Sequence, residues 1–289
     1  MFFESFLSLL IASSLHLGSP AVSAEVPFDD SVLISVSSVP FAGAGTSRPE
    51  LSAESVFAVD LSSLSVLYEK NASERRPIAS LTKLMTAYII LNENDPGTVV
   101  MVSPNAAAVG GSTMGLYAYE KITVKDLLYG LLIVSGNDAA TALAEYNAGS
   151  TAAFVSKMNK TAADLGLADT FYADVAGLEG STAYSTARDL TVLSTHLLSK
   201  SGVREIVNQK SVTLTSVSGQ THKLVSTNIL LGTLGIKGLK TGKTSLAGEC
   251  LVALADTQEH EFLTVVLGSG YRFVDTKVLV DFIQKNFIW

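Results

Sequence analysis

The chain has 289 residues, of which 47% are hydrophobic and 16% are charged, so it suits one globular domain of about 240–260 residues and is not a disordered chain. Its formal net charge of −7 provides no basic surface for phosphates, so no nucleic acid is expected as a partner. A single cysteine and four scattered histidines exclude a disulfide framework and a zinc site, and no metal or other cofactor is expected.

The first 24 residues differ in character from the rest of the chain. A mostly apolar run over 6–17 leads to the small residues Val22-Ser23-Ala24, which suit a signal peptidase that cuts before Glu25. The run is shorter than the about 20 residues that a membrane-spanning helix needs. One feature of a signal peptide is missing, because Met1-Phe2-Phe3-Glu4 contains no basic residue. We therefore predict a cleaved secretory signal over 1–24 and an exported protein, with a short uncleaved anchor as the alternative.

A folded domain is predicted over 51–289, after a linker. Residues 25–50 are rich in Ser, Pro, Ala and Gly and show no sustained period, which is typical of a linker. The short β-rich runs Val56–Asp60 and Val66–Glu69 then predict a hairpin. Apolar residues recur at helical spacing directly after Ser80, which predicts a helix there.

The middle of the chain, from about 103 to 207, is predicted to be helical. Four stretches there have a 3.6-residue period: Val124–Ile133, Asp138–Tyr146, Thr151–Leu165 and Ala187–Ser199. Strand patterns return over 212–214, 223–225, 251–254 and 262–267, and a last amphipathic helix is expected over 274–287.

This order of strands, helices, strands and a final helix indicates an α+β fold. Segments from both ends of the domain would share one antiparallel β-sheet, flanked by helices, beside an all-helical lobe. A cleft between the lobes is then the expected binding site.

Three short fragments occur in an order that suggests serine acyl-transfer chemistry: Ser80-Leu81-Thr82-Lys83, Ser135-Gly136-Asn137 and Lys240-Thr241-Gly242. Each is weak alone, because S-x-N also occurs at Ser103-Pro104-Asn105 and at Ser226-Thr227-Asn228. Together, each at the boundary of a predicted element, they match the combination of S-x-x-K, S-D-N and K-T-G in β-lactamases and penicillin-binding proteins.

Ser80 is the candidate nucleophile and Lys83 its candidate base. Backbone N–H groups at a helix start are unpaired and can stabilise an oxyanion, and a spacing of three places Lys83 on the same helix face. No histidine is placed to take the serine proton, so the lysine pKa would have to fall by about 3 units. Burial and a nearby cation, for which Lys240 is the candidate, both lower a lysine pKa. In an isolated S-x-x-K, however, the serine is usually a helix cap and the lysine a solvated residue.

Ser135 and Asn137 lie in a predicted loop between two helices. There Ser135 can relay a proton to the leaving group, and Asn137 can donate an amide hydrogen bond to a substrate carbonyl. The alternative is that Asn137 or Asp138 only caps the following helix.

The third fragment precedes a predicted strand. On a strand that lines a cleft, Lys240 would hold an anionic end of the substrate and Thr241 would donate a hydroxyl hydrogen bond. Gly242 would let the backbone approach the substrate closely. The alternative is a glycine-containing hairpin with an exposed lysine.

With these fragments the sequence resembles the low-molecular-mass penicillin-binding proteins that act as D-alanyl-D-alanine carboxypeptidases. The likeness runs from about Ser55 to the C-terminus and includes four longer stretches, at 77–87, 135–140, 185–189 and 238–242. It implies an enzyme that removes the terminal D-alanine from peptidoglycan stem peptides through an acyl-serine intermediate. It also implies acylation by β-lactam antibiotics and a periplasmic or other extracytoplasmic location facing the cell wall.

The resemblance also implies roles for individual residues. Ser80 would be acylated, Lys83 would take its proton, and Ser135 and Lys240 would relay protons and orient the substrate. The oxyanion hole would consist of the backbone N–H groups of Ser80 and Lys243.

Arg272 matches the position of a family arginine that supports the substrate carboxylate, although a lone arginine is more often a surface ion-pair partner. Lys243 places a positive charge beside the substrate site, which would alter the preference for the residue before D-alanine.

Many of these enzymes continue into a β-rich domain and an amphipathic membrane anchor, whereas this sequence ends at Trp289. Membrane attachment is therefore left open.

Three other functions share parts of this pattern. A D,D-endopeptidase that cuts peptidoglycan cross-links uses the same machinery, and the sequence does not separate it from a carboxypeptidase. A class A β-lactamase needs a general-base glutamate in an E-x-x-L-N loop, which the equivalent stretch over 177–182 lacks. A non-catalytic wall-binding protein would be favoured by loss of Ser80, Lys83 or Lys240, and all three are present.

Overall fold

The computed structural model describes residues 39–43, 47–257 and 259–289, which belong to a unit spanning Ser37–Trp289. The signal predicted over 1–24 and most of the linker predicted over 25–50 lie outside these residues. Among the described helices, none combines the length and the apolar composition that a bilayer-spanning segment needs.

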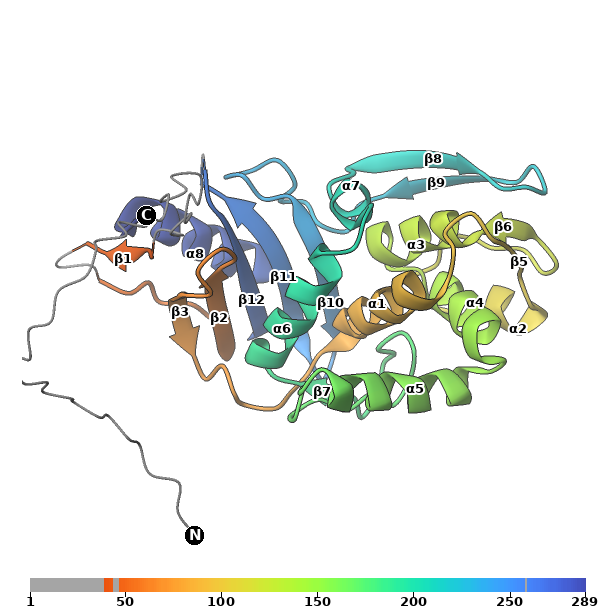
Figure 1. The fold of residues 1–289 in the computed structure, drawn as a ribbon, viewed down its shortest axis with the longest axis horizontal. Helices are drawn as coiled ribbons and strands as arrows, with labels where there is room; N and C mark the ends of the chain where they lie inside the picture. Colours follow the sequence, from red (N-terminus) through yellow and green to blue (C-terminus); the bar gives the residue numbers. More distant parts are fainter. Residues whose placement is uncertain (1–38, 44–46, 258) are drawn as a thin grey trace, which may run out of the picture. The chain divides into compact units, whose positions relative to one another are not determined.

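Strands from both ends of this unit form one five-stranded antiparallel sheet (Figure 1). Its order is β10-β11-β12-β2-β3, so a strand from the end of the chain pairs with a strand from its beginning. The strands are β2 (Ser55–Asp60), β3 (Val66–Lys70), β10 (Gly238–Thr244), β11 (Gly248–Asp256) and β12 (Glu261–Ser269). The predicted α+β fold, with both ends of the domain in one sheet, is confirmed.

Different parts of the chain cover the two faces of this sheet. Successive residues of a strand point to opposite faces, so Val56 and Ala58 pack in the cluster that contains α8 (Arg272–Asn286). Phe57 and Val59 pack in the larger cluster with the remaining helices. The edge strand β10 contacts the turn that carries Ser80. Packing on both faces therefore holds the sheet, and with it β10, in a fixed position beside that turn.

The middle of the chain forms a helical region beside the sheet (Figure 1). Its helices are α1 (Lys83–Glu93), α2 (Pro104–Ala107), α3 (Val124–Ile133), α4 (Asn137–Ala148), α5 (Thr151–Asp164), α6 (Ala187–Leu198) and α7 (Val203–Val207). Helices α3 to α6 agree with the four predicted stretches within two residues at each end. Three of them have hydroxyl N-caps, Thr123, Ser150 and Thr186, which accept hydrogen bonds from otherwise unpaired N–H groups.

Among the described residues, four two-stranded pairs lie outside the large sheet. The longest is β8 (Ser211–Thr215) with β9 (Thr221–Val225), where strands were predicted over 212–214 and 223–225, and the other three pairs were not predicted. The other three pairs are β1 (Phe41–Ala42) with β13 (Phe287–Ile288), β4 (Arg76–Pro77) with β7 (Tyr184–Ser185), and β5 (Val99–Met101) with β6 (Lys121–Thr123). Strands of two or three residues are too short to show a period, so the uniformly helical prediction for 103–207 was wrong where β6 and β7 lie.

Candidate active site

Ser80 lies in a 3₁₀ turn, Ala79–Thr82, that leads directly into α1. Neither the turn nor the helix has a side-chain N-cap, so Ser80 is not a helix cap. Lys83 is completely buried, and its Nζ lies 3.0 Å from Ser80 Oγ. The ordinary alternative, a capping serine and a solvated lysine, therefore does not describe this pair.

Three partners surround the Lys83 amine. Besides Ser80 Oγ, Nζ lies 2.8 Å from Asn137 Oδ1 and 2.6 Å from the carbonyl oxygen of Ala176. An amide oxygen and a backbone carbonyl can only accept hydrogen bonds, whereas a hydroxyl can also donate. A neutral Lys83 would therefore donate to Asn137 and Ala176 and direct its lone pair at the Ser80 hydroxyl, which is the arrangement that a general base needs.

Burial lowers the pKa of Lys83 to about 7, although the carboxylates of Asp174 and Asp138 partly oppose this shift. Lys240 on β10 is also fully buried, and its pKa lies well below the ordinary value because of burial first and then the charges of Lys83 and Arg272. We expected Lys240 to lower the Lys83 pKa. Among the causes of the Lys83 shift, however, burial is the one that lowers it. The repulsion between the two amines is instead one cause of the lowered pKa of Lys240.

Asn137 begins α4, and its side chain serves the site rather than the helix end. Its Oδ1 faces Lys83, and its Nδ2 donates to the Gly110 carbonyl oxygen at 2.9 Å. The neighbouring Asp138 accepts hydrogen bonds from the N–H groups of Met114, Gly115 and Leu116. These two residues therefore fix the segment 110–116 along one wall of the cleft.

Ser135 is buried in the turn between α3 and α4, and among the described residues its Oγ has no hydrogen-bond partner. Its φ of 63° is in the left-handed region, as is the φ of 48° at Ala79. Residues other than glycine in this region typically cost about 1–3 kcal/mol and occur often at functional sites. The structure thus brings strained backbone to both sides of the catalytic pair, and it leaves the Ser135 hydroxyl available for a further partner.

Close backbone packing places the Ser80 turn against β10 and against the segment 173–179. A Cβ on Gly242 would lie 3.0 Å from the carbonyl oxygen of Ile78 and 3.2 Å from Ser80 N. A Cβ on Gly177 would overlap the carbonyl group of Ala79. Only glycine fits both approaches, so these two positions determine where Ser80 lies between the two walls.

A cleft of about 410 Å³ opens at Ser80, with Gly110–Ser112, Asn137, Gly177–Glu179 and Lys243–Thr244 as its lining. Lys243 is exposed, and its Nζ pairs with Glu249 Oε1 at 2.9 Å. Arg272 donates from its side chain to the Gly242 carbonyl oxygen at 3.0 Å. The Thr241 hydroxyl lies 2.6 Å from the Thr227 hydroxyl. The residues predicted on the K-T-G strand therefore lie on one wall, opposite Lys83 and Asn137.

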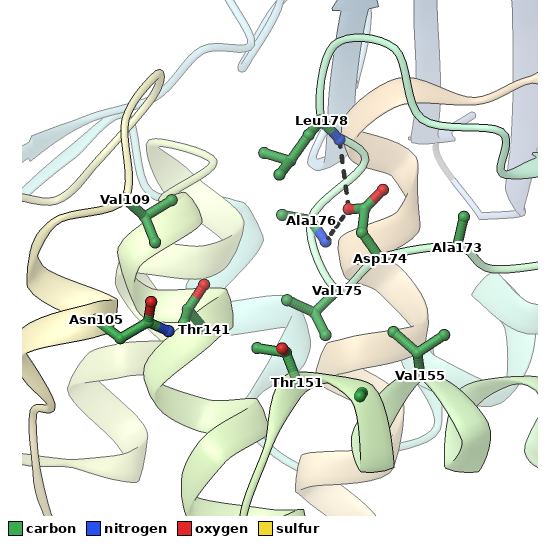
Figure 2. A pocket seen from close by; sticks show the side chains of 11 residues that line it. Asn105, Val109, Thr141, Thr151, Val155, Ala173, Asp174, Val175, Ala176 and Leu178 are labelled. Atoms are coloured by element: carbon green, nitrogen blue, oxygen red, sulfur yellow. Dashed lines mark hydrogen bonds between the residues drawn. The ribbon is translucent and has the colours of Figure 1, made fainter.

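The sequence analysis missed the segment that holds Lys83 from the other side (Figure 2). Asp174 Oδ1 accepts hydrogen bonds from the N–H groups of Ala176 at 2.8 Å and Leu178 at 3.4 Å, as Figure 2 shows. It also accepts one from the N–H group of Gly177 at 2.5 Å. These bonds hold the Ala176 carbonyl oxygen against Lys83. A backbone carbonyl has no residue-type signal, and the one available cue was the Asx-turn pattern of an aspartate two residues before Ala-Gly.

The other carboxylate of this segment, Glu179, accepts hydrogen bonds from Ser245 N at 3.1 and 3.2 Å. It therefore joins the two rims of the cleft and forms no hydrogen bond with Ser80 or Lys83. This geometry agrees with the absence of an E-x-x-L-N loop, and it gives no support to the β-lactamase alternative.

The sequence profile of the D-alanyl-D-alanine carboxypeptidase family matches residues 42–270 of this chain. The chain belongs to this family. Among relatives, D-alanyl-D-alanine carboxypeptidase DacF of Bacillus subtilis is 36% identical over 79% of this chain and 60% of its own length. DacD of Escherichia coli is 36% identical over 83% of this chain and 65% of its own length. The chain thus spans less than two thirds of the length of these two relatives.

Solved structures of this family have the same fold. The crystal structure of the Streptomyces K15 DD-transpeptidase superposes with a TM-score of 0.77 at 31% identity, covering 82% of this chain and 99% of that one. Penicillin binding protein 6B from Escherichia coli superposes with a TM-score of 0.77 at 34% identity, covering 86% of this chain and 82% of that one.

Proposed function

We propose that this protein is a serine-type D-alanyl-D-alanine carboxypeptidase that removes the terminal D-alanine from peptidoglycan stem peptides. The observation that carries the proposal is the buried Lys83 amine, whose pKa is about 7. Of its three hydrogen-bond partners, the Ser80 hydroxyl is the one that can donate. Membership of the carboxypeptidase family supports the choice of substrate.

In the acylation step, neutral Lys83 accepts the proton of Ser80 as Oγ attacks the carbonyl carbon of the penultimate D-alanine. The negative charge that forms on the carbonyl oxygen is stabilised by the backbone N–H groups of Ser80 and Lys243. The C–N bond then breaks, and the proton that Lys83 took passes through the Ser135 hydroxyl to the amine of the leaving D-alanine, which leaves Lys83 neutral again. Among the described residues the Ser135 hydroxyl has no hydrogen-bond partner, which supports this relay.

In the deacylation step, a water molecule gives a proton to Lys83 and attacks the acyl carbon. The ester bond to Ser80 breaks, and Ser80 Oγ recovers its proton from Lys83. The shortened stem peptide leaves with a new carboxylate.

Substrate binding uses the opposite wall. Lys240, Thr241 and Arg272 receive the terminal carboxylate, and the second hydrogen of Asn137 Nδ2 donates to the substrate amide. The pKa of Lys240 is lowered in the free protein, and the carboxylate of an arriving substrate raises it, so Lys240 takes up a proton from solvent as the substrate binds. β-Lactam antibiotics would acylate Ser80 in the same manner, and the predicted secretory signal would deliver the enzyme to the cell wall.

The test is an intact mass measurement after incubation with benzylpenicillin, followed by mass spectrometry of digested muropeptides. We expect one covalent adduct that Ser80→Ala abolishes. Ser112→Ala should keep it, since that serine lines the same cleft but donates to the Val134 carbonyl oxygen. Loss of one alanine from pentapeptides supports a carboxypeptidase. Loss of cross-links without loss of alanine would instead identify an endopeptidase, and an adduct that persists in Ser80→Ala would refute the proposal.

A further inference from the structure

Two exposed tyrosines lie on the segment that forms one wall of the catalytic cleft. Gly110–Ser112 line the cleft, and Asp138 accepts hydrogen bonds from the N–H groups of residues 114–116. The same segment continues to Tyr117 and Tyr119, whose residues are 59% and 67% exposed. No described residue forms a hydrogen bond or an aromatic contact with either side chain. The chain thus leads directly from the cleft to two aromatic rings that face solvent.

The turn that carries these tyrosines is held from inside the protein. Glu120 is buried, and its Oε2 accepts a hydrogen bond from Tyr117 N at 3.0 Å, while its Oε1 lies 2.7 Å from Nε2 of the buried His222. Tyr119 N donates to the carbonyl oxygen of Val102 at 2.8 Å. A carboxylate is costly to bury unless it is paired and hydrogen-bonded, and here both of its oxygens are used. This network therefore fixes the backbone on which the two rings are presented.

Tyr119 also has a strained backbone. Its φ of 65° is in the left-handed region, where a bulky residue is uncommon and costs free energy. The same kind of strain occurs at Ala79 and Ser135, on both sides of the catalytic pair. An exposed tyrosine gains no burial that would offset this cost, so packing alone does not explain why it stands here.

Exposed side chains from two hairpins continue the surface around the turn (Figure 1). Met101 of β5 is 63% exposed and lies opposite Lys121 of β6 in the antiparallel register. In the turn between β8 and β9, Ser218 N donates to the Lys121 carbonyl oxygen at 3.2 Å, and the preceding Val217 is exposed. We call these residues the tyrosine surface: Met101, Tyr117, Tyr119, Lys121 and Val217.

The tyrosine surface is too small for a stable protein partner and has the right chemistry for a sugar. Two aromatic side chains bury about 300–500 Å² on binding, less than the about 800 Å² that each partner buries in a stable protein interface. A tyrosine ring has an apolar face and a polar edge. A pyranose ring matches it, because C–H groups form an apolar face and hydroxyl groups surround its edge.

The distance from the cleft also suits a sugar that belongs to the substrate. Five residues lead from Ser112 to Tyr117, so at most about 18 Å of chain separates them. Three residues link the sugar of a stem pentapeptide to its D-alanyl-D-alanine unit, and they span about 10 Å when extended. The glycan strand continues on both sides of that sugar. Neighbouring sugars of the same strand can therefore lie over the tyrosines while the scissile bond lies at Ser80.

We propose that the tyrosine surface binds the glycan strand that carries the stem peptide, with N-acetylated sugar rings stacked on Tyr117 and Tyr119. Met101 and Val217 extend the apolar contact, and the Lys121 ammonium pairs with a carboxylate of a neighbouring stem peptide. This inference rests on the proposed function, because it assigns a second contact with the same polymeric substrate.

The experiment compares kcat/KM for one stem pentapeptide in two forms: attached to soluble uncross-linked glycan strands, and released from those strands by an amidase. We expect the wild-type protein to favour the strand-bound form about tenfold. The ratio should fall to about threefold in Tyr117→Ala and in Tyr119→Ala, and to about one in the double variant. Because each ratio is taken within one variant, a general loss of activity does not affect it.

Three controls separate stacking from other effects of the substitutions. Tyr146→Ala removes an exposed tyrosine of α4 that lies outside the tyrosine surface, and it should keep the ratio of the wild type. Tyr117→Phe and Tyr119→Phe keep the aromatic faces and should keep it as well. Isothermal titration with glycan strands freed of their peptides should show binding to the wild type and none to the double alanine variant.

Equal kcat/KM values for the two forms in the wild type, or an unchanged ratio in the double alanine variant, would overturn the inference. Self-association that the double variant loses, without a change in its ratio, would assign the tyrosine surface to a second copy of the chain and also overturn it. A benzylpenicillin adduct on Ser80 in the same preparations shows that the proposed function stands in these cases. Absence of the adduct from the wild type would remove the proposed function and this inference together.

Discussion

The two walls of the cleft use lysine in opposite ways. On the helical wall, Lys83 has a complete set of partners, none of them a carboxylate, and it titrates near neutral pH. On the sheet wall, Lys240, Lys243 and Arg272 gather around one strand, with Glu249 as the one carboxylate paired with Lys243 there. Lys240 is buried like Lys83, so burial alone does not separate the two walls. What distinguishes the sheet wall is the presence of the less buried cations Lys243 and Arg272, which suit it to attract an anion.

The largest effect should come from the helical wall. Lys83→Arg replaces the base by a guanidinium, which does not lose its proton in proteins. We expect the second-order rate of acylation by benzylpenicillin to fall by about 10³-fold or more, as for the loss of a general base that activates a nucleophile. Stopped-flow or quenched mass measurements give this rate. The matched control is Lys243→Arg on the opposite wall, which should be acylated at a rate close to that of the wild type. An acylation rate near that of the wild type in Lys83→Arg would refute the role of Lys83 as the base.

A smaller and more selective effect should come from the sheet wall. Lys240→Gln removes the buried amine that receives the substrate carboxylate, so kcat/KM for a peptide with a free terminal carboxylate should fall by about 10²-fold. The same peptide with an amidated end should be affected much less. Steady-state assays with the two peptides measure the difference. An equal loss for both would show that Lys240 belongs with the catalytic machinery of the helical wall.

The position of Ser80 between the walls can be tested with two glycines of the same loop. Gly177 and Gly180 have similar φ values, 71° and 77°, but a Cβ would overlap the Ala79 carbonyl at Gly177 and meet nothing within 4 Å at Gly180. The positive φ should cost each alanine variant about 1 kcal/mol of stability, measured by urea unfolding, and Gly177→Ala should lose more because of the overlap. Only Gly177→Ala should also slow acylation, by about tenfold, because it displaces the nucleophile. Equal acylation rates in the two variants would contradict the close-packing argument.

The smallest expected effect is the dependence of the acylation rate on pH. The active form of Lys83 is the neutral amine, so the acylation rate should rise with pH, level off above a midpoint near 7, and fall about tenfold per pH unit below it. Benzylpenicillin is a suitable probe because its carboxylate stays ionised over this range. A rate that instead decreases from pH 6 to 8 would show that a protonated lysine is required, which would move the base away from Lys83.

The long elements of the fold were predictable because each buries a wide apolar face. Helices α3 to α6 and strands β2, β3, β11 and β12 are long enough for a 3.6-residue or two-residue period to appear. Short strands such as β1, β4 and β7 exist because a partner segment, distant in sequence, lies beside them. Such pairing has no local signal.

The candidate site also contains residues that could be predicted from the sequence and features that could not. The three fragments that contain Ser80, Ser135 and Lys240 could be found by spacing and order, because their side chains carry the chemistry. The Ala176 carbonyl oxygen and the close approach of Gly177 could not, since backbone atoms contribute there and every residue has the same ones. The effect of Lys240 on the Lys83 pKa stays a prediction, because the repulsion between the two buried amines is seen here in the lowered pKa of Lys240.

The sequence by itself indicated the reaction type that we propose: a serine with a lysine one helical turn away, a second lysine on a strand, and no histidine base. The tertiary structure decided that Lys83 can act as the base. Its partners Asn137 and Ala176 lie 54 and 93 residues away along the chain, and its pKa of about 7 results from complete burial. Desolvation and hydrogen bonding across the cleft are properties of the folded packing, so no local pattern of residues specifies them.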